Sequence, residues 1–326
     1  MKYIFLLVSA LLISQAQADL LIYHLNVGMG DATLIVDTQA DKTLLIDAGS
    51  RYYGKKVVAE TIKRLGYSRI DYFVATHYDS DHIGGFSEII EAGIPFGIVY
   101  DRGEYTDKKM HTEQGEITTY CEYVGLAGAE RKTITLQWND CYTADDRLID
   151  LGEETIVDVI AVAGSFIKTD CVIDKKAIEK DEDDALSIAL LIRHGDFSCF
   201  IGGDLTGGGN RTIDMESAIA ATVGDIDVLK LNNHGSNTSS NKKFLSILRP
   251  EAVIISVGDK GANLRYRLPK QAVLDRVNDL DTDPIVFLTN RGEGGTLEDS
   301  RVEDGHIIIH TNGISYTINN MVFEVD

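Results

Sequence analysis

Two histidines and two aspartates lie close together in the segment THYDSDHIGG, residues 76–85. His77, Asp79 and Asp81 alternate along an expected turn, and His82 adds a neighbouring imidazole. Imidazole nitrogens and carboxylate oxygens are the donors with which proteins hold Zn²⁺ and Mn²⁺. The spacing suits two adjacent divalent ions, with His77 and Asp79 on one and Asp81 and His82 on the other. The segment therefore predicts a metal centre.

A simpler structural interpretation competes with this hypothesis. Aspartate and histidine also cap helices and occupy turns, and an isolated pair would favour that interpretation. Here the cluster directly follows the apolar run at residues 72–75, which is the expected end of a strand. Because loops at strand ends converge in a crevice of α/β sheets, four such side chains at one strand end favour a ligand site.

Strand-like and helical segments alternate around the cluster. Apolar runs bounded by turns predict strands at residues 20–28, 32–37, 43–49, 155–163, 186–195, 197–204, 227–233, 251–258 and 284–289. Helical spacing of apolar residues lies between them, for example over residues 58–65 and 273–280. Sheets with helices outside them, in two similar halves, predict an α/β protein with four layers, α/β/β/α.

The complete string resembles the metal-binding signature of the metallo-β-lactamase superfamily, which usually reads HxHxDH. Asp79 stands in place of the middle histidine, as is typical of the domain attached to ComEC-type DNA-uptake (competence) proteins. Further strings similar to that subgroup follow in order over residues 21–269: LNVGMGDATLIV, LLIDAG, FIGGDL, DVLKLNNHGS and ISVG. The resemblance implies the αββα sandwich of the metallo-β-lactamase fold, as a single domain over residues 19–326 with an insert at about 101–150.

The resemblance also implies a set of site residues. The metal ligands would be His77, Asp79, Asp81, His82, Asp204 and His234. They would hold two divalent ions, Zn²⁺ or Mn²⁺, with Asp204 bridging both and with Asp81 and Asp204 as the catalytic carboxylates. Asp31 and Asp47 would lie behind the ligands. Asp79 makes its half of the centre richer in oxygen, which favours Mn²⁺ beside Zn²⁺.

Three departures from the family pattern affect the expected metal ligands and substrate contacts. Asn233 replaces the first histidine of the usual HHGS string, and Leu268 replaces a histidine that usually precedes a proline. A ligand histidine that many superfamily members carry between the first cluster and the GGD aspartate has no counterpart. We expect the substrate to be contacted by Asn233, Ser236, Arg265 and Arg267, although a solvated loop is an equal alternative for the two arginines.

A pair of ions so held would activate water as the nucleophile, and the chain lacks the GxSxG string of serine hydrolases. The resemblance favours a phosphodiester substrate, with DNA as the leading candidate. The net charge of −20 argues against an extended basic groove for nucleic acid. Alternatives are an ester, lactone, β-lactam or small phosphoester such as a phosphocholine ester, and a non-catalytic binding protein on the same fold.

The first 18 residues have the pattern of a signal peptide, with Lys2, an apolar stretch and Ala16-Gln17-Ala18 before the expected cut. We therefore expect a secreted or periplasmic protein without a membrane anchor, and no protein partner is evident. An oxidising compartment permits disulfides, and Cys121 with Cys141 is the favoured pair. Cys199 is either paired or an inert core thiol. The acidic run at residues 179–184 is interpreted as a solvated loop.

Overall fold

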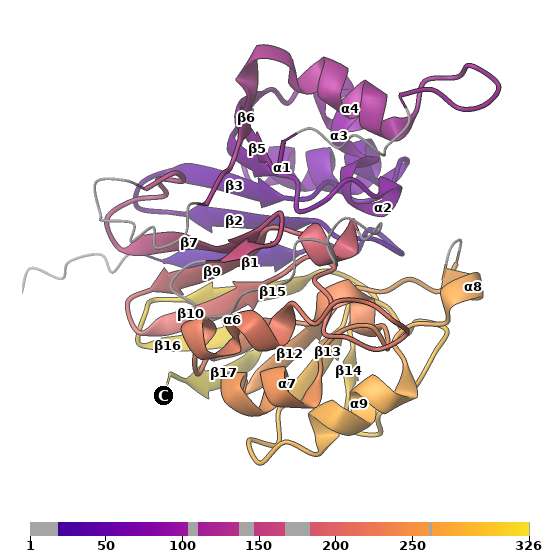
Figure 1. Ribbon diagram of the computed structural model, residues 1–326. Helices are drawn as coiled ribbons and strands as arrows, with labels where there is room; N and C mark the ends of the chain where they lie inside the picture. Colours follow the sequence, from indigo (N-terminus) through magenta and orange to yellow (C-terminus); the bar gives the residue numbers. More distant parts are fainter. Residues whose placement is uncertain (1–18, 104–109, 137–146, 167–182, 261–262, 326) are drawn as a thin grey trace, which may run out of the picture.

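Two β-sheets lie face to face and are covered by helices on their outer sides (Figure 1). The computed structural model describes residues 19–103, 110–136, 147–166, 183–260 and 263–325. Helices α1, α3 and α4 cover the first sheet, and α6, α7 and α9 cover the second (Figure 1). The four-layer α/β/β/α architecture expected from the sequence is therefore confirmed.

The first sheet has the strand order β17-β16-β15-β1-β2-β3-β4-β5-β6. Its strands are β1 (Leu20–His24), β2 (Thr33–Asp37), β3 (Lys42–Ile46), β4 (Ile70–Val74), β5 (Phe96–Asp101), β6 (Arg131–Thr133), β15 (Ile307–Thr311), β16 (Ser315–Ile318) and β17 (Met321–Glu324). β1, β2 and β3 pair antiparallel, whereas β3, β4 and β5 pair parallel. β1, β3, β4 and β5 consequently end at the same edge of the sheet.

The second sheet has the order β14-β13-β12-β11-β10-β9-β7-β8. Its strands are β7 (Thr155–Val162), β8 (Ser165–Phe166), β9 (Ala189–His194), β10 (Phe197–Ile201), β11 (Val228–Lys230), β12 (Ala252–Ile255), β13 (Ile285–Leu288) and β14 (Arg301–Val302). β10, β11, β12 and β13 run parallel, and β9 runs antiparallel to β10. The carboxyl ends of the parallel strands therefore lie beside the beginning of β9.

The helices begin at turns that follow these strands. They are η1 (Gly54–Ala59), α1 (Glu60–Arg64), α2 (Ser80–Ile83), α3 (Phe86–Glu91), α4 (Thr119–Ala127), η2 (Gly128–Glu130), η4 (Asp184–Leu186), α6 (Glu216–Val223), η5 (Asn232–Gly235), α7 (Lys242–Leu248), α8 (Asn263–Tyr266) and α9 (Gln271–Asn278). Asn241 caps α7 because its side chain accepts a hydrogen bond from the Phe244 N–H. Within the described residues, none of these helices is long and apolar enough to cross a membrane.

The core has one apolar layer between the sheets and one layer under each group of helices. In β1, Leu20 and Ile22 are fully buried in the layer between the sheets, as the two-residue period of a strand requires. Every residue of β2 is buried because both faces of that strand are covered. Cys199 of β10 is a fully buried thiol in the core, which supports the core-thiol alternative.

The predicted insert at about 101–150 contains the helix α4 and the edge strand β6. β6 pairs parallel with β5, so this part of the insert extends the first sheet. The signal-peptide segment 1–18, Cys141 and Cys171 lie outside the described residues. The predicted cleavage and the predicted Cys121–Cys141 pair accordingly stay predictions.

Candidate metal centre

The sequence cluster at residues 76–85 lies at the carboxyl end of β4. Asp79 is extended, with φ −72° and ψ 148°, and α2 starts immediately after it, carrying Asp81 and His82 in its first turn. Asp47 follows β3, the parallel neighbour of β4. Since both strands end at one edge, Asp47 meets the cluster there. The Thr76 N–H donates to Asp47 Oδ1 at 2.8 Å, which ties the two strand ends together.

The second sheet contributes Asp204 after β10 and His234 after β11. Gly203 has φ 56°, and Asn233 and His234 have φ 47° and 49°. This left-handed backbone costs glycine little and is tolerated by asparagine, but histidine adopts it only when the surroundings hold it there. The tight turn directs the His234 side chain towards the first sheet. The ligands from the two sheets therefore meet at their common edge.

One group of carboxylates and imidazoles surrounds His82 and His234. Asp204 Oδ1 lies 3.4 Å from His82 Nε2 and 3.6 Å from His234 Nε2. Asp81 Oδ2 lies 4.0 Å and 3.6 Å from the same two nitrogens. Donor atoms of Asp31, His82, Asp204 and His234 also lie within 4.8 Å of one another. A single divalent ion would fit among these atoms.

The three histidines are oriented by acceptors behind them. His82 Nδ1 donates to Asp47 Oδ2 at 2.7 Å, and His234 Nδ1 donates to the Ser256 carbonyl at 2.9 Å. His77 Nδ1 donates to Thr76 Oγ1 at 3.1 Å, while that hydroxyl donates to Asp47. In a neutral imidazole, a proton on Nδ1 leaves a lone pair on Nε2. All three rings therefore present Nε2 as the ligand atom.

These Nε2 atoms supply a direct test of whether the site suits a metal. His77, His82 and His234 are at most 1% exposed, and their Nε2 atoms have no hydrogen-bond partner among the residues that the structure describes. The buried Oδ1 atom of Asp204 likewise has none. Buried polar atoms without partners are costly and rare, so a cluster of them demands a ligand. Divalent ions bound among these side chains would satisfy all four atoms.

A second group surrounds His77. Donor atoms of His77, Asp79 and Asp184 lie within 4.8 Å of one another, and Asp184 Oδ1 is 3.9 Å from His77 Nε2. Asp184 begins η4, directly before β9. Residues 179–182 of the run interpreted as a solvated loop lie outside the described part of the chain. Asp183 is buried and the partly exposed Asp184 lies among the candidate ligands, so that interpretation is wrong for these two residues.

In the ion-free protein, the closely spaced aspartates shift the pKa values of the histidines beside them. Burial lowers the pKa of His234, but the charges of Asp204 and Asp31 outweigh burial and raise it to about 9. The pKa of His82 is also raised, since Asp204 and Asp47 outweigh burial. Burial raises the pKa of Asp81, but the nearby imidazoles of His234 and His82 outweigh burial and bring the pKa down to about 2. In the ion-free protein, protonated His82 and His234 therefore supply the positive charge that bound ions would otherwise provide.

Asp31 also reaches the centre and has a partner that the sequence did not reveal. Its Oδ2 forms a buried ion pair with Lys230 Nζ on β11, and its Oδ1 lies 3.8 Å from His234 Nδ1. A buried lysine without a countercharge would be strongly destabilising. The pair links the loop after β1 to the strand that carries His234.

Of the four residues expected to contact the substrate, the two arginines are exposed, whereas Asn233 and Ser236 contact other side chains of the protein. Arg265 and Arg267 are exposed on and beside α8, and the Arg265 guanidinium lies 5.6 Å from the centre of the Tyr266 ring. The loop after α8 is joined to the centre because the Lys270 N–H donates to the Gly235 carbonyl at 2.9 Å. Figure 1 shows α8 projecting from the body of the protein.

Asn233 and Ser236 make contacts within the protein. Asn233 Nδ2 donates to Asp184 Oδ2 at 2.9 Å, which engages the amide with the metal centre. Ser236 Oγ accepts from the backbone N–H and the hydroxyl of Thr238. Leu268 is 3% exposed in the apolar layer under the second sheet's helices, so it offers the site no proton.

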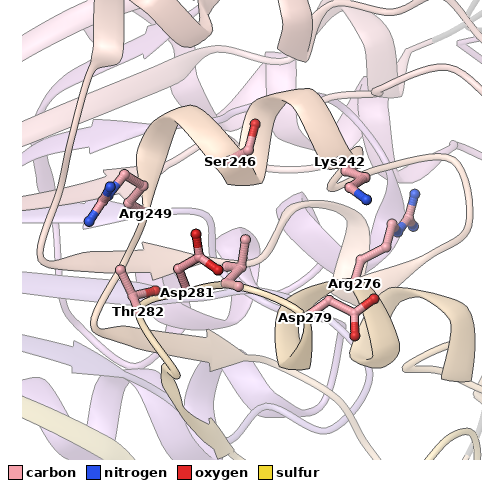
Figure 2. Close-up of a pocket in the computed structure, with 8 residues that line it drawn as sticks. Lys242, Ser246, Arg249, Arg276, Asp279, Asp281 and Thr282 are labelled. Carbon is pink, nitrogen blue, oxygen red and sulfur yellow. The ribbon is translucent and has the colours of Figure 1, made fainter.

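A separate pocket of about 300 Å³ lies between α7 and α9 (Figure 2). Cationic and anionic side chains on these helices and directly after them surround it, including Lys242 on α7 and Arg249 and Asp279 just beyond the two helix ends. None of its lining residues belongs to either ligand group. The pocket is therefore distinct from the metal centre.

Comparisons with known proteins agree with the site. Residues 25–114 match the model of the metallo-beta-lactamase superfamily. The chain is 27% identical over 256 residues to competence protein ComA of Neisseria gonorrhoeae, covering 77% of this chain and 28% of ComA. It is 22% identical over 277 residues to ComE operon protein 3 of Bacillus subtilis, covering 80% of this chain and 30% of the relative. The chain thus spans less than a third of these relatives.

Among solved structures, the metallo-beta-lactamase fold protein YhfI from Bacillus subtilis aligns with a TM-score of 0.45 and 12% identity, over 84% of this chain and 98% of YhfI. The matched family region contains the whole cluster at residues 76–85. The chain has the metallo-β-lactamase fold, and its resemblance to that superfamily, and within it to competence proteins of the ComEC type, is confirmed.

Proposed function

We propose that this protein is a metal-dependent hydrolase that cleaves phosphodiesters. The observation that carries the proposal is the convergence of three buried, unpartnered imidazole Nε2 atoms with the carboxylates of Asp81 and Asp204 at one sheet edge. Divalent ions bound there would activate a water molecule and polarise the phosphoryl oxygens. The resemblance to competence proteins supports a phosphodiester substrate, with DNA as the leading candidate.

Charge explains why ions are needed for such a substrate. Four carboxylates, those of Asp79, Asp81, Asp184 and Asp204, surround the site, and the whole chain carries −20. A phosphodiester would be repelled by this arrangement until cations reverse the local charge. The exposed Arg265 and Arg267 beside α8 would add positive charge near the entrance. We propose that these two arginines hold a phosphate outside the ions.

The residues have separate roles in this proposal. Asp204 Oδ1 approaches both His82 and His234, and the resemblance to the superfamily supports a role for Asp204 as the ligand that both ions would share. Asp81 approaches both His82 and His234 and would orient the attacking water by accepting its proton. Asp47 holds His82 in the ligating tautomer. Leu268 provides no acid for the leaving group, so we expect aryl phosphodiesters, whose leaving groups need no proton, to react faster than DNA.

A substrate panel tests the proposed function. Ion-free protein is loaded with Mn²⁺ or Zn²⁺ and incubated with linear DNA, a bis-aryl phosphate, a phosphocholine ester and a lactone. We expect cleavage of the two phosphodiesters, and a loss of at least about 100-fold in His82→Ala and Asp204→Ala. Asp225→Asn, which removes one exposed carboxylate elsewhere, should retain activity. Hydrolysis of the lactone alone would replace the phosphodiesterase proposal, and no hydrolysis by folded, loaded protein would favour a binding protein.

Export remains a prediction from the sequence, since residues 1–18 lie outside the described part of the chain. If the segment directs secretion, the substrate is met outside the cytoplasm.

A further inference from the structure

Asp184 is not among the metal ligands that the resemblance implies, yet it lies beside His77 in the structure. Its Oδ1 is 3.9 Å from His77 Nε2, and the Asp79 carboxylate completes the group within 4.8 Å. His77 is fully buried, and its Nε2 has no hydrogen-bond partner. The unpartnered nitrogen is therefore presented to two carboxylates. An acidic cluster alone would not define a site, but a buried lone pair directed into it does.

Asn233 determines which oxygen of Asp184 is available. Its Nδ2 donates to Asp184 Oδ2 at 2.9 Å, so Oδ1 remains on the His77 side. The backbone at Asn233 is held in place because its N–H donates to the Gly203 carbonyl at 3.1 Å. Asparagine also tolerates the left-handed backbone of this turn, with φ 47° and ψ 45°. The side-chain amide that extends from this turn thus orients the carboxylate.

The residue before Asp184 anchors it from the other side. Asp183 forms a buried ion pair with Arg102, and its Oδ2 accepts a hydrogen bond from the Tyr78 N–H at 3.2 Å. Tyr78 directly follows His77, so this contact fixes the backbone of residues 183 and 184 beside that ligand. Asp184 is consequently held at both its backbone and its outer oxygen.

The two halves of the centre differ in their donor atoms. The His77 half offers one imidazole with the carboxylates of Asp79 and Asp184. The other half offers two imidazoles, those of His82 and His234, with carboxylates. Oxygen ligands suit hard ions such as Mn²⁺ and Mg²⁺, whereas imidazole suits Zn²⁺. The chemistry of the ligands therefore separates the two halves.

We propose that Asp184, oriented by Asn233, is a metal ligand that completes the His77 half and makes it selective for a hard divalent ion such as Mn²⁺. The other half takes a borderline ion such as Zn²⁺. This inference rests on the proposed metal centre but not on the proposed substrate. Asn233 acts as a positioning residue because it contacts the carboxylate and not the ion.

Binding measurements without substrate test the inference. Ion-free full-length protein is first given one equivalent of Zn²⁺ and then titrated with Mn²⁺, with free Mn²⁺ followed by electron paramagnetic resonance. We expect wild type to bind one further Mn²⁺, and Asp184→Asn to bind it at least about tenfold more weakly. Asn233→Ala should weaken Mn²⁺ binding less, and Asp225→Asn should match wild type. Circular dichroism establishes that each variant is folded.

Asp184→His supplies the complementary test. It gives this half a second imidazole beside His77 in place of a carboxylate, so we expect Zn²⁺ to displace Mn²⁺ more readily than in wild type. Mn²⁺ affinity in Asp184→Asn within twofold of wild type would overturn the inference, as would unchanged metal preference in Asp184→His. Two bound ions with no hydrolysis of any substrate would reject the proposed function alone and leave this inference intact.

Discussion

At the scale of single residues, the centre depends on hydrogen bonds behind the ligands. Asp47 is 1% exposed and accepts from His82 Nδ1 at 2.7 Å and from Thr76 at 2.7–2.8 Å. It therefore keeps the His82 lone pair on Nε2 and joins β3 to β4. Such outer partners are part of a metal site because they set the tautomer and orientation of each ligand.

Asp47→Ala should weaken the metal ion beside His82 by about 10–100-fold, because the imidazole loses the acceptor that orients it. Calorimetric titration of ion-free protein with Zn²⁺ measures the affinity. Asp158→Asn, a partly exposed carboxylate paired with Arg193 on the second sheet, is the control and should bind Zn²⁺ as wild type does. Equal affinity in Asp47→Ala and wild type would show that Asp47 does not position His82.

The protonation of His234 predicts opposite pH effects on stability and metal binding. Its pKa in the ion-free fold is about 9, above the ordinary value of 6.5. The resulting contribution to the free energy of unfolding is fully present below pH 6.5 and is lost as the pH rises through about 9. Ion-free protein should therefore melt at lower temperature as the pH rises across this window. Metal affinity should rise over the same window, because fewer protons must be displaced.

Thermal unfolding and Zn²⁺ titration at pH 6.5, 8 and 9 check this prediction. The His234→Gln variant should show a flatter dependence of the ion-free melting temperature on pH. A dependence as steep as that of wild type would assign the effect to other groups.

At the scale of elements, the segment between β11 and α7 is held by one buried carboxylate. Glu216, at the start of α6, accepts from the backbone N–H groups of Ser240 and Asn241 and from Asn232 Nδ2, at 2.6–2.8 Å. Burial raises the pKa of Glu216 to about 7, although these three donors oppose the rise. The segment that carries His234 is therefore attached to α6 as well as to its own strand.

Glu216→Ala should lower the free energy of unfolding by about 3 kcal/mol or more, since it leaves three buried donors without an acceptor. It should also weaken metal binding, because His234 lies on the segment that the carboxylate holds. Urea unfolding measures the first effect and Zn²⁺ titration the second. Glu60→Ala, on the exposed face of α1, should change neither. If the variant loses stability but binds Zn²⁺ as tightly as wild type, Glu216 does not position His234 for metal binding.

At the scale of the whole molecule, the ligands join two sheets that otherwise meet through an apolar core. His77 and His82 come from the first sheet, whereas Asp204 and His234 come from the second. Lys230 and Asp31 form a further polar link across the same edge. Bound ions would therefore connect the two sheets and stabilise the folded chain, because the unfolded chain cannot assemble the site.

Metal removal should lower the melting temperature. At ion concentrations about 1,000 times Kd, binding contributes about 4 kcal/mol, which corresponds to roughly 5–10 °C for a protein of this size. Differential scanning calorimetry with and without a chelator measures the shift. Asp204→Ala, which lacks the central ligand, should show little response to added ions. Equal melting temperatures for loaded and chelated wild type would contradict the proposed metal centre.

The sequence by itself determined the local parts of this centre. His77, Asp79, Asp81 and His82 share one turn, so their spacing could be read directly, and the succession of strand-like and helical segments in two similar halves indicated the four layers. Tertiary structure alone decided the partnership of Asp184 with His77 and Asn233 and that of Lys230 with Asp31. These pairs join residues far apart in the chain, and only the order and direction of strands bring them together. Local periodicity records whether a residue is buried, but not which distant charge it meets.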